Sequence, residues 1–475
     1  MTIAHMSMSH TFHPSILREY DIRGIVGETL FAADARAVGR CFGTVVRRRN
    51  PGRTDLTVAV GWDGRLSSPD LMAALVEGLT AAGVNAVRIG RGPTPMLYFA
   101  VCDQNLAGGI MITGSHNPPT HNGLKMMIGK KPFFGDDIRA LGPMAVSGDV
   151  ESGPGRASDR ETFTAYIARV VADFKGTRAL TAVWDPGNGA AAETVKAAVA
   201  RLPGRHTVIN DTIDGTFPNH HPDPTVPKNL VQLQAEVARL KADVGFAFDG
   251  DGDRIGVIDG RGRILWGDQI MQILAESVLK THPGATLIAD VKASRAFFDE
   301  VSRMGGKPMM WKTGHSLIKN RMAEVGSPLA GEMAGHIFFA DTWYGFDDAL
   351  YVAARFLDIM ASDPGFDLVR RFDAMPKLIN TPELRFPCAD ERKFAVIDEV
   401  KARLKTAGAD VVDIDGVRVN VPGGWWLLRA SNTQAVLVAR AEADTDANLE
   451  KLKTELAAQL KKSGLDLPED ASAGH

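Results

Sequence analysis

Ser115 stands where a strand could expose a nucleophile. It belongs to the TGSHNPP sequence of residues 113–119, which follows an apolar run at 108–112. That run is typical of a buried strand, and the Gly, Asn and Pro residues after it indicate a tight turn. A strand that ends in a glycine-flanked hydroxyl presents a nucleophile at the edge of a sheet. Because serines in turns commonly bond only their own backbone, this one needs chemical partners elsewhere in the chain.

A second cluster places three carboxylates close together in the sequence. Asp249, Asp251 and Asp253 alternate with glycines in the sequence DGDGDR, after an apolar run at 244–248. Like charges at this spacing repel, and a hard divalent cation bound by their oxygens relieves the repulsion. The loop does not fit an EF-hand, which requires other residues at two of its positions. We therefore predict a Mg²⁺ site, with a solvated acidic turn as the alternative.

A donor-rich segment near the C-terminus is suited to a phosphate group. Residues 429–433 (RASNT) combine a guanidinium with two hydroxyls and an amide. A guanidinium binds a phosphate dianion through two parallel hydrogen bonds, and neutral donors beside it add further contacts. The sequence therefore favours phosphate binding here, with a generic polar turn as the alternative.

Single polar side chains between these segments are candidates for the same site. His315 lies at a predicted helix N-terminus, a position that favours anions. Glu332 and His336 flank a Gly-rich loop, and the glycines argue against the helix that a metal motif of this spacing requires. Lys125, which follows Ser115 in the next apolar segment, could place an ammonium beside it.

Alternating strand and helix patterns must position these residues, and they predict α/β layers over most of the chain. Residues 56–60 form an apolar β-type run, Ser68 is the predicted N-cap of the helix that follows, and 84–89 restore a strand. A strand followed by an Asp/Gly turn recurs at 182–184, 244–248 and 286–289. Similar α/β domains in series are therefore expected.

Three breaks divide the chain into four predicted domains. A polar, Gly-rich stretch at 148–159 is the predicted linker after the first domain, and further breaks fall near 259–262 and 374–381. Beyond the last break, strand-like runs and a Lys/Glu/Leu helix at 446–461 indicate a smaller α+β domain. We therefore expect domains at 1–155, 156–262, 263–375 and 376–475.

The composition predicts a soluble protein without a charged arm. The 475 residues carry a formal net charge of −3, and 45% of them are hydrophobic. Roughly 100 to 200 residues per domain gives about three or four domains for this length. No basic excess favours nucleic acid, and no apolar run approaches the roughly 18 residues of a membrane span. Three widely spaced cysteines and a start without signal-peptide features favour the cytoplasm.

Five motifs in this order resemble the α-D-phosphohexomutase superfamily, and its bacterial phosphomannomutase/phosphoglucomutase branch in particular. They are REYDIRG at 18–24, TGSHNPP at 113–119, DGDGDR at 249–254, GEMAGH at 331–336 and RASNT at 429–433. Each motif is modest alone, but five in family order over nearly the whole chain are specific. The resemblance implies an α/β fold around a central cleft, with three related mixed α/β domains in series and a smaller C-terminal α+β domain.

The resemblance also implies roles for individual residues. Ser115 would be a phosphorylated nucleophile, and its phosphate would share a Mg²⁺ ion with Asp249, Asp251 and Asp253. Glu332 would bind sugar hydroxyls. The substrate phosphate that is not reacting would bind Arg429, Ser431, Asn432 and Thr433. The side chains that would act with Ser115 in catalysis are Arg23, Lys125 and His336. Those that would contact the substrate near the reaction centre are Tyr20, Arg254, Lys292 and His315.

The implied activity is the interconversion of hexose 1-phosphate and 6-phosphate, with mannose, glucose or both as the sugar. Phosphoserine gives its phosphoryl group to the free hydroxyl, the resulting 1,6-bisphosphate reverses its orientation, and the serine takes back the other phosphoryl group. A hexose 1,6-bisphosphate would serve as activator. We expect phosphorylated hexoses as partners, neither nucleic acid nor membrane, and a monomer or weak homodimer.

Alternative activities share parts of this pattern. Phosphoglucosamine mutase is the near alternative, and Asn432 speaks against it because that branch usually has Gly there. A sugar-phosphate hydrolase would need water at the phosphoserine, and a sugar-phosphate sensor would bind without turnover.

Two positions depart from the pattern of the superfamily. Ala334 stands where the family commonly has Ser. The missing hydroxyl could remove a hydrogen bond to the sugar worth about 0.5–1.5 kcal/mol, which puts tight discrimination between hexoses in doubt. Gln434 follows the RASNT segment where the family often has Pro, which indicates a looser phosphate loop.

Overall fold

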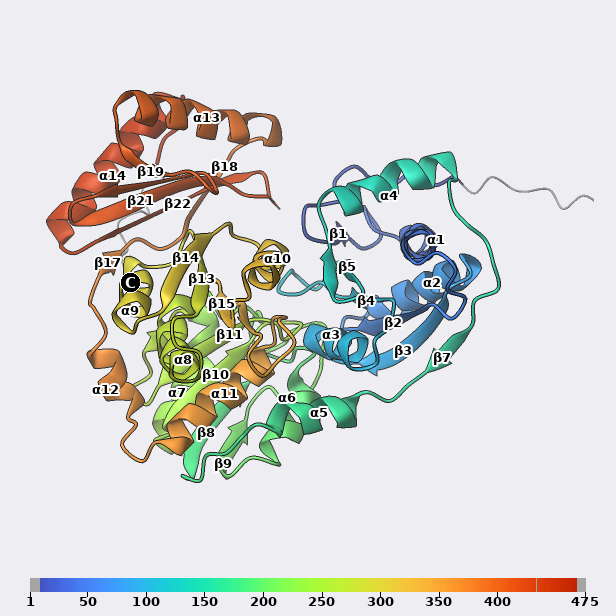
Figure 1. Ribbon diagram of the computed structural model, residues 1–475, viewed down its shortest axis with the longest axis horizontal. Helices are drawn as coiled ribbons and strands as arrows, with labels where there is room; N and C mark the ends of the chain where they lie inside the picture. Colours follow the sequence, from blue (N-terminus) through green and yellow to red (C-terminus); the bar gives the residue numbers. More distant parts are fainter. Residues whose placement is uncertain (1–8, 433, 468–475) are drawn as a thin grey trace, which may run out of the picture.

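Four β-sheets follow one another along the chain in the computed structural model, which describes residues 9–432 and 434–467 (Figure 1). Each sheet with its helices is called a unit below. The sheet of the first unit has the order β1-β5-β4-β2-β3-β7, with β6 paired to β5. Its strands are β1 (Ile22–Ile25), β2 (Thr57–Trp62), β3 (Asn85–Arg91), β4 (Gly108–Ile112), β5 (His121–Ile128), β6 (Lys131–Phe133) and β7 (Ala157–Asp159). Its helices are α1 (Ala32–Arg49), α2 (Ser68–Ala81), α3 (Thr94–Asp103) and α4 (Asp136–Ser147).

The second unit has a five-stranded sheet in the order β12-β11-β10-β8-β9. Its strands are β8 (Leu180–Asp185), β9 (Gly204–Val208), β10 (Val244–Phe248), β11 (Ile255–Asp259) and β12 (Ile264–Leu265). The helical segments of this unit are α5 (Phe163–Val171), α6 (Ala192–Val199), the 3₁₀ turn η1 (Pro227–Leu230) and α7 (Val231–Leu240).

The third unit has a four-stranded sheet in the order β14-β13-β15-β16. Its strands are β13 (Thr286–Asp290), β14 (Lys307–Trp311), β15 (Leu329–Gly331) and β16 (Ile337–Phe339). Its helices are α8 (Gly267–Thr281), α9 (Arg295–Arg303), α10 (His315–Val325), α11 (Ala349–Ser362) and α12 (Leu368–Asp373).

The fourth, C-terminal unit has a sheet whose strand pairs are all antiparallel in the residues described. Its strands are β17 (Ile379–Asn380), β18 (Leu384–Pro387), β19 (Asp410–Val412), β20 (Val417–Val421), β21 (Gly424–Ala430) and β22 (Val436–Ala443). Helices α13 (Asp390–Thr406) and α14 (Asp446–Lys461) pack on this sheet. In Figure 1 this unit, drawn in orange and red, lies across from the blue first unit.

The first three sheets contain the same four-strand arrangement, as the recurring sequence pattern predicts. The shared orders are β5-β4-β2-β3, β11-β10-β8-β9 and β16-β15-β13-β14. In each case the first pair is antiparallel and the other two pairs are parallel. The loops between the third and fourth strands in chain order, at 113–120, 249–254 and 332–336, carry three of the five motifs.

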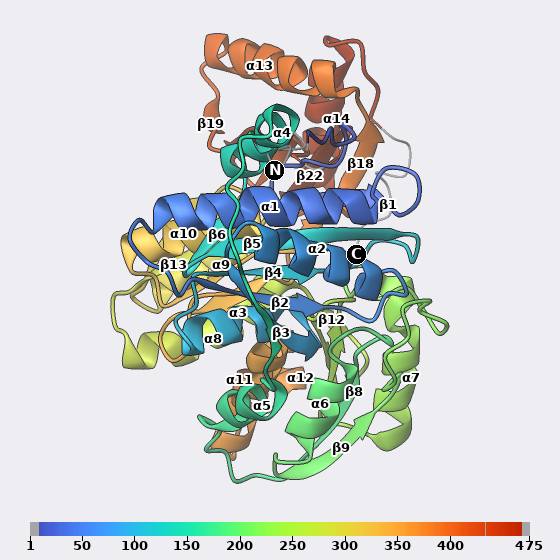
Figure 2. The same cartoon turned by 90° about the vertical axis from the view of Figure 1, so that its right-hand side faces the viewer.

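The apolar core divides the molecule differently from its sheets. One buried cluster contains Val101 of α3, Ile167 of α5, Phe246 of β10 and Leu350 of α11, so it joins the first three units. Figure 2 shows α5 beside α11, where the second and third units meet. The C-terminal unit has its own separate cluster. A small buried cluster of Val291, Trp425 and Leu427 joins the C-terminal unit to the third. The first three units therefore share one large apolar core, and the C-terminal unit meets them through a smaller one.

The predicted fold class is confirmed, and two local predictions need correction. The stretch interpreted as a linker ends in β7, which pairs with β3; all three residues of β7 are exposed, so no apolar alternation marks the strand. Helix α2 begins at Ser68, and the N-cap is Ser67, because the Ser68 hydroxyl donates to Asp63 instead. Strand β12 lies beyond the predicted boundary at 262, yet it pairs with β11. The domain limits stay predictions. Among the helices described, none is long and apolar enough to cross a bilayer.

Candidate active site

Ser115 directly joins two units of the molecule. It lies in the β4–β5 loop with a φ of +48°, a backbone conformation that residues other than Gly seldom adopt, and its side chain is buried. Its Oγ donates a hydrogen bond of 2.9 Å to Oδ2 of Asp249 and lies 3.1 Å from Nδ1 of His116. The strand therefore delivers the hydroxyl to the aspartate loop of the second unit.

The aspartate loop has the donor set of a hard-cation site. Ligand oxygens of Asp249, Asp251 and Asp253 all lie within 4.8 Å of one another, and all three residues are buried. Oδ1 of Asp251 and Oδ1 of Asp253 have no hydrogen-bond partner among the residues described. Burial and the carboxylates of Asp253 and Asp251 raise the pKa of Asp249 well above its ordinary value. Buried carboxylate oxygens without donors fit a divalent cation such as Mg²⁺, which prefers oxygen ligands.

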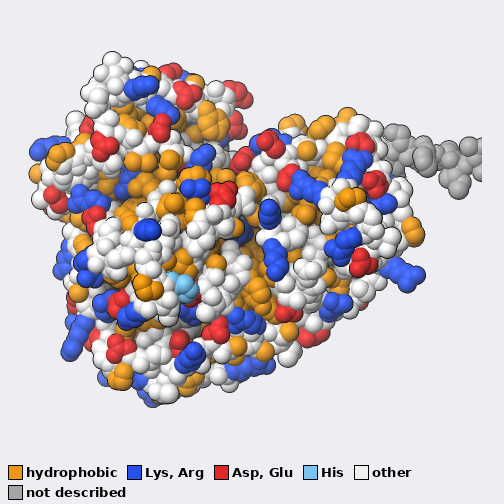
Figure 3. Space-filling model, in the orientation of Figure 1, with side chains coloured by type: hydrophobic (Ala, Val, Ile, Leu, Met, Phe, Trp, Pro, Cys, Tyr) orange, Lys and Arg blue, Asp and Glu red, His pale blue; other side chains and the backbone are white. Residues whose placement is uncertain are grey.

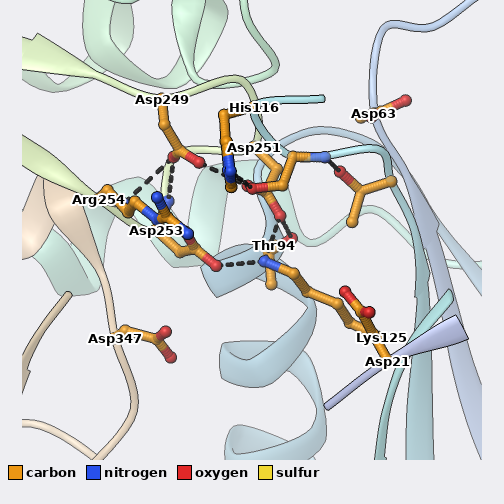
Figure 4. Close-up of polar contacts among 12 residues, drawn as sticks. Asp21, Asp63, Thr94, His116, Lys125, Asp249, Asp251, Asp253, Arg254 and Asp347 are labelled. Carbon is orange, nitrogen blue, oxygen red and sulfur yellow. Dashed lines mark hydrogen bonds and ion pairs between the residues drawn. The ribbon is translucent and has the colours of Figure 1, made fainter. Parts of the chain in front are cut away.

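Lys125 supplies a positive charge to the same loop from β5. Its Nζ donates 2.8 Å to Oδ2 of Asp251 and also contacts Asp253 (Figure 4). Burial opposes the charge of the ammonium, yet Asp251 and Asp253 raise the pKa of Lys125 well above its ordinary value. Thr94, at the start of α3, donates 2.5 Å to the same Oδ2 of Asp251. Two residues of the first unit thus hold Asp251 in place.

The third unit contributes the β15–β16 loop and the N-terminus of α10. The Gly314 N–H, one residue before α10, donates 2.8 Å to Oε1 of Glu332. Burial raises the pKa of Glu332. His315 begins α10, as predicted, and burial followed by the Lys319 ammonium lowers its pKa well below the ordinary value. This pocket wall therefore carries a buried carboxyl and a neutral imidazole.

His336 connects this loop to the aspartate loop. Nε of Arg254 donates 2.9 Å to Nε2 of His336. On its other side, Nδ1 of His336 lies 2.9 Å from Oδ2 of Asp347 and 3.6 Å from Oδ1 of Asp253. The carboxylate beside Nδ1 favours the tautomer that carries its proton there. Nε2 is therefore the basic nitrogen of this ring.

The C-terminal unit meets the other units through Tyr20. The Tyr20 hydroxyl donates a hydrogen bond of 2.9 Å to the Thr313 carbonyl and accepts one of 2.8 Å from Nδ2 of Asn432. Arg429 lies at the end of β21, and its Nε donates 3.1 Å to Oδ2 of Asp415. The predicted phosphate ligand Thr433 lies outside the residues that the structure describes.

One cavity of about 190 Å³ brings the predicted side chains together. All four units line it, and Figure 3 shows the notch between the C-terminal and first units in the same orientation as Figure 1. The predicted residues on its wall are Tyr20, Arg23, Ser115, Lys125, Arg254, Lys292, His315, Glu332, His336, Arg429, Ser431 and Asn432. The aspartates lie behind Ser115, so donors for a phosphorylated ligand surround a hydroxyl next to a cation site.

Several residues of this arrangement escape sequence reasoning. Thr94 of the first unit contacts Asp251 of the second, and Asp347 contacts His336 within the third; no local motif marks either of them. Glu383, a residue of the C-terminal unit, accepts a hydrogen bond of 2.9 Å from Nζ of Lys292. Asp63 and Arg65 bind the serine loop, and the Asp-Gly turn after a strand, which recurs in the sequence, is the signal that could have found them.

Comparison with known proteins places the site in a family. Models of phosphoglucomutase/phosphomannomutase match the chain in four consecutive stretches: alpha/beta/alpha domain I at residues 14–141, domain II at 161–262, domain III at 266–378 and the C-terminal domain at 383–459. The chain belongs to the phosphoglucomutase/phosphomannomutase family.

Individual members of the family resemble the chain over almost its full length. It is 42% identical over 458 residues to a phosphomannomutase/phosphoglucomutase of Pseudomonas aeruginosa, covering 96% of this chain and 98% of the relative. A phosphoglucomutase of Neisseria meningitidis is 40% identical over 456 residues, covering 94% and 97%. The crystal structure of a phosphoglucomutase/phosphomannomutase family protein from Burkholderia thailandensis matches with a TM-score of 0.90 at 42% identity, over 96% of this chain and 100% of that one.

Proposed function

We propose that the chain is a phosphohexomutase that interconverts the 1-phosphate and 6-phosphate of mannose, glucose or both through a phosphoserine at Ser115. The observation that carries the proposal is the 2.9 Å contact between the Ser115 hydroxyl and Asp249 of the cation site, inside a cavity lined by all four units. The names of the relatives, phosphomannomutase/phosphoglucomutase and phosphoglucomutase, support the same activity.

Asp249, Asp251 and Asp253 would hold Mg²⁺ together with the phosphate on Ser115. When bound, the ion neutralises charge on the phosphoryl group that is transferred. Lys125 would serve the same end, because its ammonium already lies against Asp251 and the cavity. Arg23, whose Nη1 donates 3.0 Å to the Thr113 carbonyl, would bring a second cation to the loop.

The transfer itself exchanges one phosphorus–oxygen bond for another. The bond between phosphorus and Oγ of Ser115 breaks while a bond forms from phosphorus to a free hexose hydroxyl, and the hydroxyl proton leaves to a base. His336 is the candidate base, since Nε2 is its basic nitrogen and the ring lines the cavity; Arg254 would have to release that nitrogen. The bisphosphate then turns, and Oγ of Ser115 takes the other phosphoryl group in the reverse of these steps.

The far end of the ligand would be held by the C-terminal unit. Arg429, Ser431, Asn432 and Thr433 would bind the phosphate that is not reacting, with His315 and Lys292 near the sugar. Glu332 would accept hydrogen bonds from sugar hydroxyls, which the two orientations of the ligand present to it in turn. A site with one reacting phosphate and one anchored phosphate needs this separation of roles.

The proposal is tested by turnover with mannose 1-phosphate and glucose 1-phosphate, in Mg²⁺ and a catalytic amount of hexose 1,6-bisphosphate. We expect both 6-phosphates as products and nearly complete loss of activity in Ser115→Ala. Glucosamine 6-phosphate in parallel separates a phosphoglucosamine mutase. Steady release of inorganic phosphate in place of isomerised sugar would favour a hydrolase, and binding without turnover a sensor. An active alanine variant would refute the phosphoserine.

A further inference from the structure

Arg65 is a buried arginine whose guanidinium binds the backbone of the loop that carries Ser115. It lies between β2 and α2 and is 2% exposed. Its guanidinium donates to four backbone carbonyls of the β4–β5 segment: Ser115 at 2.8 Å, Asn117 at 2.6 Å, Pro118 at 2.6 Å and His121 at 2.9 Å. The bond to Ser115 is buried and the other three are partly buried. No lysine could make all four bonds, because its three N–H groups radiate from one atom.

Asp63 completes this attachment. Its Oδ2 accepts from the Gly114 N–H at 3.0 Å and from Nε of Arg65 at 3.2 Å. A Cβ on Gly114 would lie 2.2 Å from the guanidinium, so the glycine of the motif is required by the approach of Arg65. The positive φ of Ser115 occurs within the stretch that these two side chains hold.

Arg65 also contacts the second unit with its other face. The guanidinium carbon lies 5.2 Å from the centre of the Phe217 ring, and Gly215 packs against the Arg65 backbone so closely that a Cβ there would lie 2.5 Å from the Arg65 Cα. The two units meet again where the Ser115 carbonyl approaches Gly250 of the aspartate loop, at 2.3 Å from the position of a Cβ. One side chain therefore contacts the serine loop and the unit that carries the cation site.

We propose that Arg65 is a positioning residue that sets the Ser115 hydroxyl against the aspartate loop. This role rests on the proposed function only in its effect on rate; its effect on the loop is independent of any activity. Loss of the clamp releases four carbonyls, and the nucleophile moves relative to the cation site. A misplacement of about 1 Å can cost on the order of a hundredfold in rate.

The test is Arg65→Lys, with Arg47→Lys as matched control. Arg47 belongs to the same unit and also binds two backbone carbonyls, at 3.0 and 3.3 Å, but neither is in the serine loop. We expect Arg65→Lys to lower kcat by about 10- to 100-fold with KM within about threefold, and Arg47→Lys to change neither. In hydrogen exchange followed by mass spectrometry, peptides over 113–122 should exchange faster only in the Arg65 variant.

The exchange measurement separates this proposal from the proposed function. Unchanged exchange over 113–122 in a folded Arg65→Lys protein would overturn the positioning role, whatever the enzyme does. Faster exchange in a protein whose wild type shows no isomerase activity would contradict the mutase and leave the clamp standing. Equal loss of protection throughout the first unit would mean a general structural role and would also overturn it. If Arg65→Lys fails to fold, Asp63→Asn takes its place, because Asp63 binds both Nε of Arg65 and the Gly114 N–H. That variant should also raise exchange over 113–122, and an unchanged loop in it would overturn the proposal.

Discussion

The β4–β5 loop of the first unit and the β15–β16 loop of the third occupy the same place in two copies of one four-strand arrangement. Both are held by an aspartate at the C-terminal end of an earlier strand of the same sheet, β2 in the first unit and β13 in the third. Asp63 accepts from the Gly114 N–H, and Asp290 accepts from the Met333 N–H, each at 3.0 Å. The same aspartate–amide hydrogen bond therefore holds the equivalent loop in two of the repeated units.

The two loops differ in what the basic residue after that aspartate does. Arg65 turns back and binds its own loop. Lys292 instead donates to Glu383 of the C-terminal unit. Arginines of that unit bind the carbonyls around Lys292: Arg418 binds those of Val291 and Ala293 at 2.7 and 2.8 Å, and Arg440 that of Lys292 at 2.6 Å. The Ser115 loop is thus held by its own unit, whereas the turn at Lys292 is held by the C-terminal unit.

The second unit departs from both. Its equivalent aspartate, Asp185, accepts from the Gly187 N–H of its own turn at 2.9 Å and lies 2.9 Å from Nε2 of His220. The aspartate loop is held instead by its own carboxylate, because Asp249 accepts from the N–H groups of Asp253 and Arg254. The loop of the candidate cation site is thus held without the aspartate that ends β8.

The largest effect is expected from a change in the aspartate loop, whose Asp249 accepts the hydrogen bond of the Ser115 hydroxyl. Asp251→Asn removes a charge from the cation site and disturbs the contacts of Lys125 and Thr94. We expect kcat to fall by on the order of 10²–10³-fold, as for loss of a single electrostatic stabiliser. A chelator should abolish wild-type activity, and added Mg²⁺ should restore it. Full activity in the chelator would contradict the cation site.

The matched pair Asp63→Asn and Asp290→Asn tests the comparison itself. An amide keeps one acceptor oxygen, so Asp63→Asn cannot serve the Gly114 N–H and Arg65 as before. We expect kcat to fall by about 10- to 100-fold with little change in KM, because the nucleophile is misplaced. Asp290→Asn should raise KM more than it lowers kcat. The comparison fails if steady-state kinetics give both variants the same division between kcat and KM.

Arg418→Lys tests whether the turn at Lys292 depends on the C-terminal unit. The guanidinium carbon of Arg418 also lies 3.6 Å from the centre of the Trp425 ring, and both carbonyl bonds come from Nη1. The ammonium of lysine ends one bond short of Nη1 and has no planar group to stack, so the substitution weakens these contacts. We expect about a tenfold loss of kcat/KM. Hydrogen exchange should rise over 290–294 and stay unchanged over 113–122. Loosening of both segments would show that the two loops are not independent.

Ala334→Ser should have the smallest effect. Ala334 lines the cavity beside Glu332, and the hydroxyl that many family members have there could bond to the sugar. One such bond is worth about 0.5–1.5 kcal/mol, or roughly two- to tenfold in the ratio of kcat/KM between mannose and glucose phosphates. Competition between the two sugars in one assay measures that ratio. An unchanged ratio would mean that the residue at position 334 does not contribute to discrimination between mannose and glucose phosphates.

Sequence alone predicts the parts of this molecule whose signal is local. The apolar runs at 108–112 and 244–248 coincide with β4 and β10, and the helix at 446–461 coincides with α14. The motif residues belong to four different sheets, and they line one cavity because the units pack with these loops toward it. The position of each loop after its strand could be inferred from the alternating pattern, but the packing of the units could not.

What sequence could not give are the contacts made by residues without a motif. Thr94 reaches Asp251 across 157 positions, and Asp347 meets His336 where its backbone bridges Phe338 of β16. Arg65 follows an Asp-Gly turn that looks like any other connection between strand and helix. Its importance comes from the fold, which brings four carbonyls of the β4–β5 segment to one guanidinium.

The most direct test of the account follows the phosphoryl group itself. Protein carrying ³²P on Ser115, confirmed by peptide mapping, is mixed with excess unlabelled mannose 6-phosphate or glucose 6-phosphate in a single turnover. The account predicts that the label leaves the serine and appears in hexose bisphosphate and hexose monophosphate, while the serine becomes rephosphorylated without label. Label released as inorganic phosphate, or retained on Ser115 while the sugar isomerises, would contradict it.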